Sequence, residues 1–420
     1  MESTSQSPQV DTDRQLKARE YAQLRRRLSF INMGIVAILL LFIFWTGLDV
    51  GLRDQLVSLN WQPLTGWYPL QILIFFLVLM LGYQIIHAPL AYYGGFFLPH
   101  RFGLSTMTLK SWLLDLFKGL VLGLVLEICA VELVYALLAT QPLTWWLWVA
   151  LAMLLFSVIM ANLAPVLLFP LFYKFKPLPE GDLTQRLLAL ANRAHTRVRG
   201  VFTMELSSKT TAANAALMGL GNTRRIVVGD TMIDRYTPDE IEVVLAHELG
   251  HHVHHDIWKL IISQSVLTLA GLYLVNVALH WAVDAQNFYL SLADPATIPF
   301  LLVLTALFGL IVMPVGNSLS RAIEYQADEY ALQSTRMVEP FKSAMTRLAN
   351  QNLADIEPSP IIEILFHDHP SIGKRLRHAD AFARRYALTA SISEPNSVAV
   401  SSTEPPGIVN SGSSTPDAVH

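Results

Sequence analysis

Six long apolar segments constrain the fold of this chain more than any other feature of its sequence. They cover about residues 30–50, 69–91, 111–140, 145–172, 257–283 and 297–318. Each segment is long enough to cross the roughly 30 Å of hydrocarbon in a bilayer as an α-helix. Charged residues make up only 15% of the chain, which is too few to cover a soluble protein built from such helices. We therefore predict a mostly α-helical fold, with a polytopic helical bundle embedded in the lipid bilayer.

The distribution of Lys and Arg predicts the orientation of this bundle. Residues 1–29 form a basic tail, and six spans place three loops on the same side of the membrane, namely 92–110, 173–256 and 319–420. In the opposite loops, Arg53 is the only basic residue. Because cytoplasmic loops are richer in Lys and Arg, we expect both termini and the long polar loops to be cytoplasmic. We expect a bacterial plasma membrane, or the endoplasmic reticulum if the chain is eukaryotic.

One short motif predicts a chemistry. His247-Glu248-Leu249-Gly250-His251 has the pattern H-E-x-x-H, within a segment whose apolar residues recur at helical spacing. Residues four apart on an α-helix lie about 40° from each other around its axis, so both imidazoles can bind one metal ion. Glu248 then lies beside the first ligand, where a carboxylate takes a proton from water. The alternative is a buried amphipathic helix whose histidines are only hydrogen-bonded.

The start of the motif's helix is also encoded locally. Thr237 is a suitable N-cap, Pro238 suits the first helical position, and Glu240 lies three residues after the cap. This pattern predicts a capping box, which places the histidines in the third turn of the helix.

The polar stretches, with the H-E-x-x-H motif that they contain, predict a cytoplasmic, zincin-like catalytic domain that is split around the last two spans. We expect a helix near 183–196, a small β element from strands near 201–206 and 225–228, and further helices in 335–387. The predicted order is a basic tail (1–29), four transmembrane helices (30–172), the first catalytic part (173–256), two transmembrane helices (257–318), the second catalytic part (319–387) and a disordered tail rich in Ser, Pro and Thr (388–420).

A catalytic zinc site needs a third protein ligand besides two imidazoles. The best candidate is Glu324, in the run R-x-x-E-x-Q-A-D directly after the last span. A hairpin of the last two spans would bring it to the two histidines. Asp328, one helical turn further, would then accept a hydrogen bond from the second nitrogen of a ligand histidine. The alternative is that Glu324 pairs with Arg321 on a solvated helix face.

Together these motifs resemble the type I CaaX prenyl proteases, which are integral-membrane zinc metalloendopeptidases. The resemblance extends from about residue 69 to 375 and includes the H-E-x-x-H motif, the R-x-x-E-x-Q-A-D run, Asn214-Ala215-Ala216, and His369-Pro370 with Arg375. It implies that His247, His251 and Glu324 bind one Zn²⁺ ion per chain, that Glu248 is the general base, and that Asp328 lies behind the metal site.

The resemblance assigns further roles around the metal. His369 and Arg375 match residues beside the catalytic centre, where a cation or an N–H donor stabilises an oxyanion. Asn214, Ala215 and Ala216 match the segment that holds an extended peptide substrate by strand addition. The family encloses its site in a chamber formed by the membrane helices. This chain departs from eukaryotic members in having one span rather than two before residue 69.

The substrate is left open by the sequence. The resemblance to the family implies a peptide or protein substrate. In the reaction for which the family is named, this substrate is C-terminally prenylated. We expect no nucleic-acid partner. A membrane-protein quality-control metalloprotease without prenyl specificity is an alternative. A divalent-metal transporter is a second alternative, although transport does not require Glu248 between two metal ligands. The spans also contain Glu127 and Glu132, which either face a polar interior or reach the edge of the bilayer.

Overall fold

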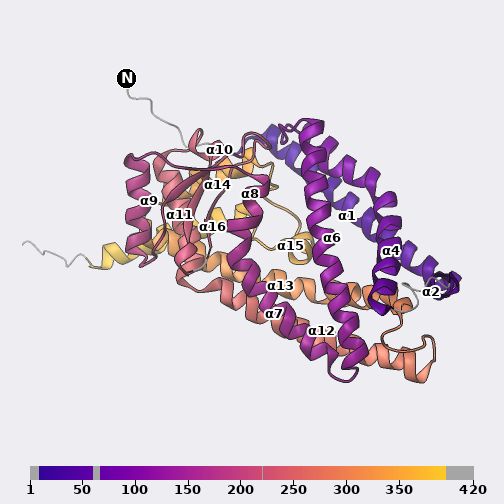
Figure 1. Cartoon of the computed structure of the whole chain (residues 1–420). Helices are drawn as coiled ribbons and strands as arrows, with labels where there is room; N and C mark the ends of the chain where they lie inside the picture. The colour runs from indigo at the N-terminus through magenta and orange to yellow at the C-terminus, as the bar shows by residue number, and fades with distance from the viewer. Residues whose placement is uncertain (1–8, 60–66, 220, 394–420) are drawn as a thin grey trace, which may run out of the picture.

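The computed structural model of the chain describes residues 9–59, 67–219 and 221–393. It is mostly helical, and a sheet of four short strands lies at one end of the molecule (Figure 1). This architecture confirms the predicted fold class. The long apolar helices and their direct extensions are α1 (Thr12–Thr46), α4 (Tyr68–Tyr92), α5 (Leu98–Arg101), α6 (Leu109–Thr140), α7 (Trp145–Leu163), α8 (Phe169–Phe172), α12 (Asp256–His280) and α13 (Ile298–Thr335).

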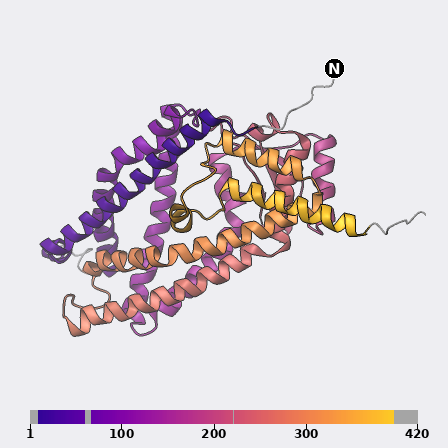
Figure 2. The same cartoon turned by 180° about the vertical axis from the view of Figure 1, so that it is seen from behind.

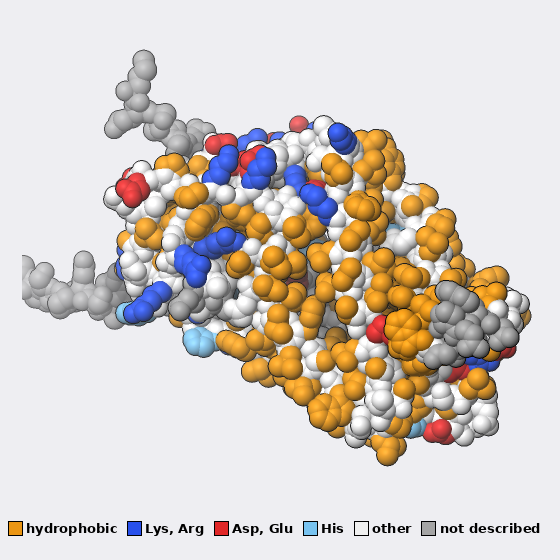
Figure 3. Space-filling model, in the orientation of Figure 1, with side chains coloured by type: hydrophobic (Ala, Val, Ile, Leu, Met, Phe, Trp, Pro, Cys, Tyr) orange, Lys and Arg blue, Asp and Glu red, His pale blue; other side chains and the backbone are white. Residues whose placement is uncertain are grey.

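Six helical stretches in the described residues are long and apolar enough to cross a membrane, as predicted. Four precede residue 173 and two follow residue 255. Short π-helical stretches join α4 to α5, join α7 to α8 and extend α12. Figure 2 shows α12 and α13 running side by side as a hairpin that returns to the sheet end. The apolar side chains cover most of the face in Figure 3, while charged side chains gather over the sheet end.

The two ends of the bundle differ from the sequence-based boundaries. Helix α1 begins at Thr12, so most of the predicted basic tail is helical. There Gln15 is buried, and its amide hydrogen-bonds the main chain of Ala354 and Ile356. Helix α13 continues without a break from the last span to Thr335, so Glu324 lies on the same helix as that span.

The sheet has the strand order β1-β2-β4-β3. Its strands are β1 (Phe175–Pro177), β2 (Val201–Met204), β3 (Ala215–Met218) and β4 (Arg225–Gly229). The pair β2–β4 is parallel, and β1–β2 and β4–β3 are antiparallel. Strands β2 and β4 were predicted from the sequence, whereas β1 and β3 were not. Strand β3 forms one edge of the sheet, so one side of its main chain has no neighbouring strand.

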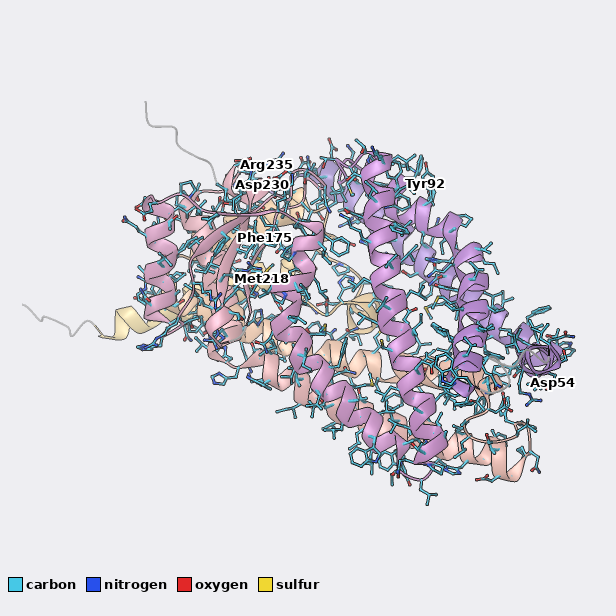
Figure 4. All side chains as sticks on the ribbon, viewed as in Figure 1. Asp54, Tyr92, Phe175, Met218, Asp230 and Arg235 are labelled. Atoms are coloured by element: carbon cyan, nitrogen blue, oxygen red, sulfur yellow. The ribbon has the colours of Figure 1, made fainter. Side chains whose placement is uncertain are left out.

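Asp230 fixes the loop that follows β2. It begins α10 (Asp230–Ile233), and its carboxylate accepts hydrogen bonds from the main-chain N–H groups of Leu206, Ser207 and Thr231. Figure 4 shows Asp230 at the sheet end of the molecule, far from Asp54 in α2 (Leu48–Ser58). These hydrogen bonds satisfy the main-chain N–H groups at the start of the loop.

A hydrophobic core joins the sheet to the remaining helices. These are α9 (Asp182–Arg193), α11 (Pro238–Val253), α14 (Val338–Gln351), α15 (Pro360–Phe366) and α16 (Ile372–Ser393). Leu245 and Leu249 of α11, Val228 of β4 and Phe341 of α14 are fully buried in this core. Helix α16 includes residues 388–393, which corrects the predicted start of the disordered tail, and residues 394–420 lie outside the described part of the chain.

Candidate metal centre

Helix α11 carries the H-E-x-x-H motif and begins as predicted. The Thr237 side chain accepts from the Glu240 N–H at 3.3 Å, and the Glu240 carboxylate accepts from the Thr237 N–H at 2.7 Å. The second oxygen of Glu240 accepts from Arg347 of α14 at 2.8 Å. Helix α11 is therefore anchored at its start, and its apolar face is buried against the sheet.

Gly250, inside the motif, sets the distance between α11 and α13. A Cβ atom at this position would lie 3.0 Å from the Cα atom of Ala327 and 3.2 Å from the Cβ atom of Tyr330. Because a side chain would collide there, the glycine permits the two helices to approach closely. This close approach brings Glu324, three residues before Ala327, to the two histidines.

The three predicted ligands converge at one point. The Nε2 atoms of His247 and His251 lie 3.2 Å apart. The Glu324 carboxylate lies 3.3 Å from Nε2 of His247 and 3.4 Å from Nε2 of His251. His247 and Glu324 are buried, and His251 is half-buried. The hairpin of α12 and α13 thus brings Glu324 to the two histidines, as expected from the sequence.

The donor atoms fit a tetrahedral cation. Two Zn–N bonds of about 2.0–2.1 Å at a tetrahedral angle separate the nitrogens by roughly 3.3 Å, which agrees with the observed spacing. One oxygen of Glu324 is buried and has no hydrogen-bond partner in the described residues. Such an unsatisfied oxygen is costly unless a ligand occupies the space before it. Two imidazoles and a carboxylate are also the donor types that Zn²⁺ prefers.

Each histidine has a carboxylate behind it. Asp328 lies 2.9 Å from Nδ1 of His247, and Asp256 lies 3.0 Å from Nδ1 of His251. These contacts hold the proton on Nδ1 and leave Nε2 free to bind a metal. Asp256 was not predicted as a site residue. It is the first residue of α12, and the left-handed backbone of His255 turns the chain so that Asp256 faces His251.

The local charges favour a cation. Burial and the nearby Arg375 oppose protonation of His247, but the carboxylates of Asp328 and Glu324 outweigh them and raise its pKa to about 9. The negative potential of these carboxylates also attracts a divalent cation.

Arg375 lies behind the metal site, on the side of Asp328. Its Nε and Nη2 atoms donate to the two oxygens of Asp328 at 2.8 and 2.6 Å, and the side chain is buried. The guanidinium thus forms a two-pronged contact with the carboxylate that holds His247. This contact faces Nδ1 of His247, while Nε2 of the same ring faces His251 and Glu324.

His369 lies on the open side of the site. Its Nε2 atom is 3.2 Å from Glu324, and its Nδ1 atom is 2.8 Å from Asp368. The carboxylates of Asp368 and Glu324 raise the pKa of His369 to about 10. His369 is thus held between two carboxylates and lines the same cavity as Glu248.

Arg321 holds the loop that carries His369. It donates to the main-chain oxygens of Glu363 and His367 at 3.0 and 2.6 Å, and Asn317 donates to that of Leu365 at 2.7 Å. Arg321 therefore braces this loop, and the alternative in which it pairs with Glu324 on a solvated face is wrong.

Glu248 lines a cavity of about 560 Å³ next to the three ligands. Asn214, Ala215 and His369 line the same cavity, which explains how residues distant in sequence reach one site. Ala216 is paired with β4 instead and is not among the lining residues. The neighbouring His254 packs against Tyr330 and is not part of the cluster of His247, His251 and Glu324.

The two halves of the chain each match a family model. Residues 177–383 match Peptidase family M48, and residues 4–174 match the CAAX prenyl protease N-terminal region, described as five membrane helices. The chain belongs to peptidase family M48. It is therefore a metalloprotease of the family that also contains the CAAX prenyl proteases, as the resemblance implied. Four candidate spans lie in the described residues before 174, one fewer than the family description names.

Relatives of this M48 peptidase cover most of its length. The CAAX prenyl protease 1 homolog of Arabidopsis thaliana is 30% identical over 71% of this chain and 70% of its own. The uncharacterized metalloprotease YhfN of Bacillus subtilis is 27% identical over 86% of this chain and 84% of its own. The crystal structure of S. mikatae Ste24p is 24% identical and has the same fold, with a TM-score of 0.78 over 90% of this chain and 92% of that one.

Proposed function

We propose that this M48 metalloprotease is a membrane-embedded zinc metalloendopeptidase with one Zn²⁺ ion per chain. The observation that carries the proposal is the spacing of 3.2–3.4 Å between the donor atoms of His247, His251 and Glu324. Glu248 borders the same cavity beside these ligands. A bound zinc ion supplies a Lewis acid, which acidifies water and polarises the peptide carbonyl.

Other residues around the metal centre have separate roles in the reaction. Glu248 accepts the proton of the attacking water and returns it to the leaving amine. His369, on the open side, stabilises the negative charge that develops on the carbonyl oxygen. Asp328 and Asp256 orient the two imidazoles, and Arg375 acts through Asp328 as a positioning residue.

The edge strand β3 offers a docking surface for the substrate. Asn214 and Ala215 lie at the start of this strand and line the cavity next to Glu248. An extended peptide that pairs with the free edge of β3 would pass the metal centre. Main-chain pairing of this kind accepts varied side chains, so it is compatible with many peptide sequences.

Replacing the base tests the mechanism. Glu248→Gln keeps the shape of the side chain and removes its basicity, so we expect peptide cleavage to fall by about 10²–10⁴-fold with zinc content unchanged. Asp239→Asn, on the exposed start of the same helix, is the matched control. Full cleavage by a Glu248→Gln protein that contains zinc would show that Glu248 is not the general base.

Prenylated C-terminal peptides are the substrate class we favour, because the relatives include a CAAX prenyl protease 1 homolog of Arabidopsis thaliana and the CAAX prenyl protease 1 of Saccharomyces cerevisiae. Purified protein should be assayed with a farnesylated peptide and an unmodified peptide of the same sequence. Preferential cleavage of the farnesylated peptide supports this class. Equal cleavage of both favours membrane-protein quality control. Membership in a peptidase family argues against the transporter alternative.

We also propose that the metal centre and both termini are cytoplasmic. The excess of Lys and Arg on the predicted inner loops, against Arg53 alone outside, supports this orientation. A bacterial plasma membrane, or the endoplasmic reticulum if the chain is eukaryotic, is the expected location. Protease accessibility of a tag at either terminus in sealed vesicles tests the orientation.

A further inference from the structure

The extended segment before β3 points its main chain in alternating directions. The N–H of Gly229 in β4 donates to the carbonyl of Asn214 at 2.8 Å, so the main chain of Asn214 faces β4. Successive residues of a strand face opposite sides, and therefore Ala213, Ala215 and Leu217 face the free edge. This edge is the surface at which a substrate strand would pair.

The side chain of Asn352, at the end of α14, occupies the first of these positions. Its Oδ1 atom accepts from the N–H of Ala213 at 2.9 Å, and its Nδ2 atom donates to the carbonyl of Ala213 at 3.2 Å. One amide thus satisfies both main-chain groups of Ala213, as a neighbouring strand would. Gln351 similarly donates to the carbonyl of Thr211 at 2.7 Å, two residues earlier.

The free edge accordingly begins at Ala215. In the described residues, no side chain hydrogen-bonds the outward main-chain groups of Ala215 or Leu217 as Asn352 does those of Ala213. Ala215 also lines the cavity that contains Glu248. A peptide strand can therefore pair beside the metal centre but must leave the sheet at Ala213.

The direction of the substrate follows from strand pairing. Antiparallel pairs outnumber parallel pairs about two- to three-fold, and a peptide antiparallel to β3 runs toward Ala213. The residues after the cleaved bond would then reach Asn352. A peptide bound in this direction could pair with the edge only as far as Asn352, which limits the number of residues after the cleaved bond.

A basic side chain lies beyond this closed end. Arg25 of α1 lines the metal cavity and also the adjoining pocket formed with Ala212 and Asn352. In the described residues, Arg25 has no acidic partner, whereas Arg375 pairs with Asp328 in the same cavity. The guanidinium lies over the ring of Tyr21, and a guanidinium without an acidic partner at the end of a peptide path matches a carboxylate.

We infer that Asn352 terminates the peptide-docking edge of β3, and that Arg25 beyond it binds the C-terminal carboxylate of the substrate. Both roles rest on the proposed peptidase function. Asn352 and Arg25 would then determine how many residues a substrate can have after the cleaved bond.

A set of peptides that differ only in the number of residues after the cleaved bond tests the role of Asn352. In the wild type, kcat/KM should fall once the peptide exceeds a certain length. In Asn352→Ala, this fall in kcat/KM for the longest peptides should be about fivefold smaller, which corresponds to the free energy of roughly one hydrogen bond. Asn352→Asp, which keeps the volume and removes the donor to Ala213, is a second variant. Asn350→Ala, on the same helix end, is the control and should keep the wild-type profile. An equal loss at every length in Asn352→Ala would mean a purely structural role and overturn the inference.

Peptides with a free acid or an amide at the C-terminus test Arg25. The wild type should cleave the acid about tenfold better, as expected for a hydrogen bond to a charged group, and Arg25→Gln should abolish this preference. Arg27→Gln, on an exposed position of the same helix, should retain it. A preference that persists in Arg25→Gln overturns the assignment. If the zinc-loaded wild type cleaves none of the peptides, the proposed function itself fails, which is a distinct result.

Discussion

Asp256 lies 3.0 Å from Nδ1 of His251, just as Asp328 lies 2.9 Å from Nδ1 of His247. Two carboxylates from different helices therefore hold the two candidate metal ligands in the same tautomer. Lys259 donates to the second oxygen of Asp256 at 2.8 Å, so Asp256 itself is held in place. The symmetry of this arrangement makes Asp256 a functional candidate that the motif alone did not reveal.

We predict that Asp256→Asn weakens zinc binding about 10–100-fold, because the amide no longer fixes the proton on Nδ1 of His251. Zinc affinity measured by competition with a chelator checks this change. Asp239→Asn should bind zinc as the wild type does. Unchanged zinc affinity in Asp256→Asn would show that Asp256 does not support the metal centre.

Gly250→Ala should separate α11 from α13, because its Cβ atom would meet the main chain of Ala327 at 3.0 Å. A shift of the ligand helices by a few tenths of an ångström displaces Glu324 from the histidines, and cleavage should fall at least about tenfold. Gly316→Ala, in an open position of α13, is the control. Comparable cleavage by both variants would exclude the close helix contact as a requirement.

Removing Arg375 should destabilise the protein. Arg375→Met leaves the buried carboxylate of Asp328 without its two-pronged partner, which costs about 3–5 kcal/mol. By contrast, Arg377→Ala breaks a solvent-exposed pair with Glu357 and should leave the stability nearly unchanged. Unfolding of the purified proteins in detergent measures the difference, and equal stability of the two variants contradicts a structural role for Arg375.

Acid should destabilise the sheet region through Asp230. Burial raises the pKa of Asp230, but the hydrogen bonds from Ser207, Leu206 and Thr231 outweigh it and lower the pKa below 3.8. A lowered folded-state pKa stabilises the fold above the unfolded value, and this stability is lost as pH falls. The wild type should therefore lose its advantage over Asp230→Asn as the pH falls below the unfolded-state pKa and through the lowered folded-state pKa of Asp230. Thermal unfolding at several pH values checks this, and parallel pH profiles of the two proteins contradict it.

Much of the fold could be predicted because hydropathy and helix caps act locally. The six spans, the capping box at Thr237 and the ligand spacing of His247 and His251 all follow from nearby residues. The convergence of Glu324 could be predicted too, because the last two spans form a hairpin.

Contacts that depend on tertiary geometry could not be predicted. Asp256 reaches His251 only because His255 adopts a left-handed backbone at the helix junction. Asn352 reaches Ala213 from 139 residues away, and no pattern in either segment indicates the pairing. The start of α1 at Thr12 was missed for another reason, since it has a local N-cap in Asp11, whose side chain accepts from the N–H groups of Asp13 and Arg14.

Zinc content measured together with peptide cleavage, for the wild type and Glu324→Ala, tests the central claim most directly. The wild type should contain one zinc ion per chain and cleave peptide. Glu324→Ala should lose both, because two imidazoles alone leave the ion one protein ligand short. Stoichiometric zinc and undiminished cleavage in Glu324→Ala would contradict the assignment of His247, His251 and Glu324 as one metal centre.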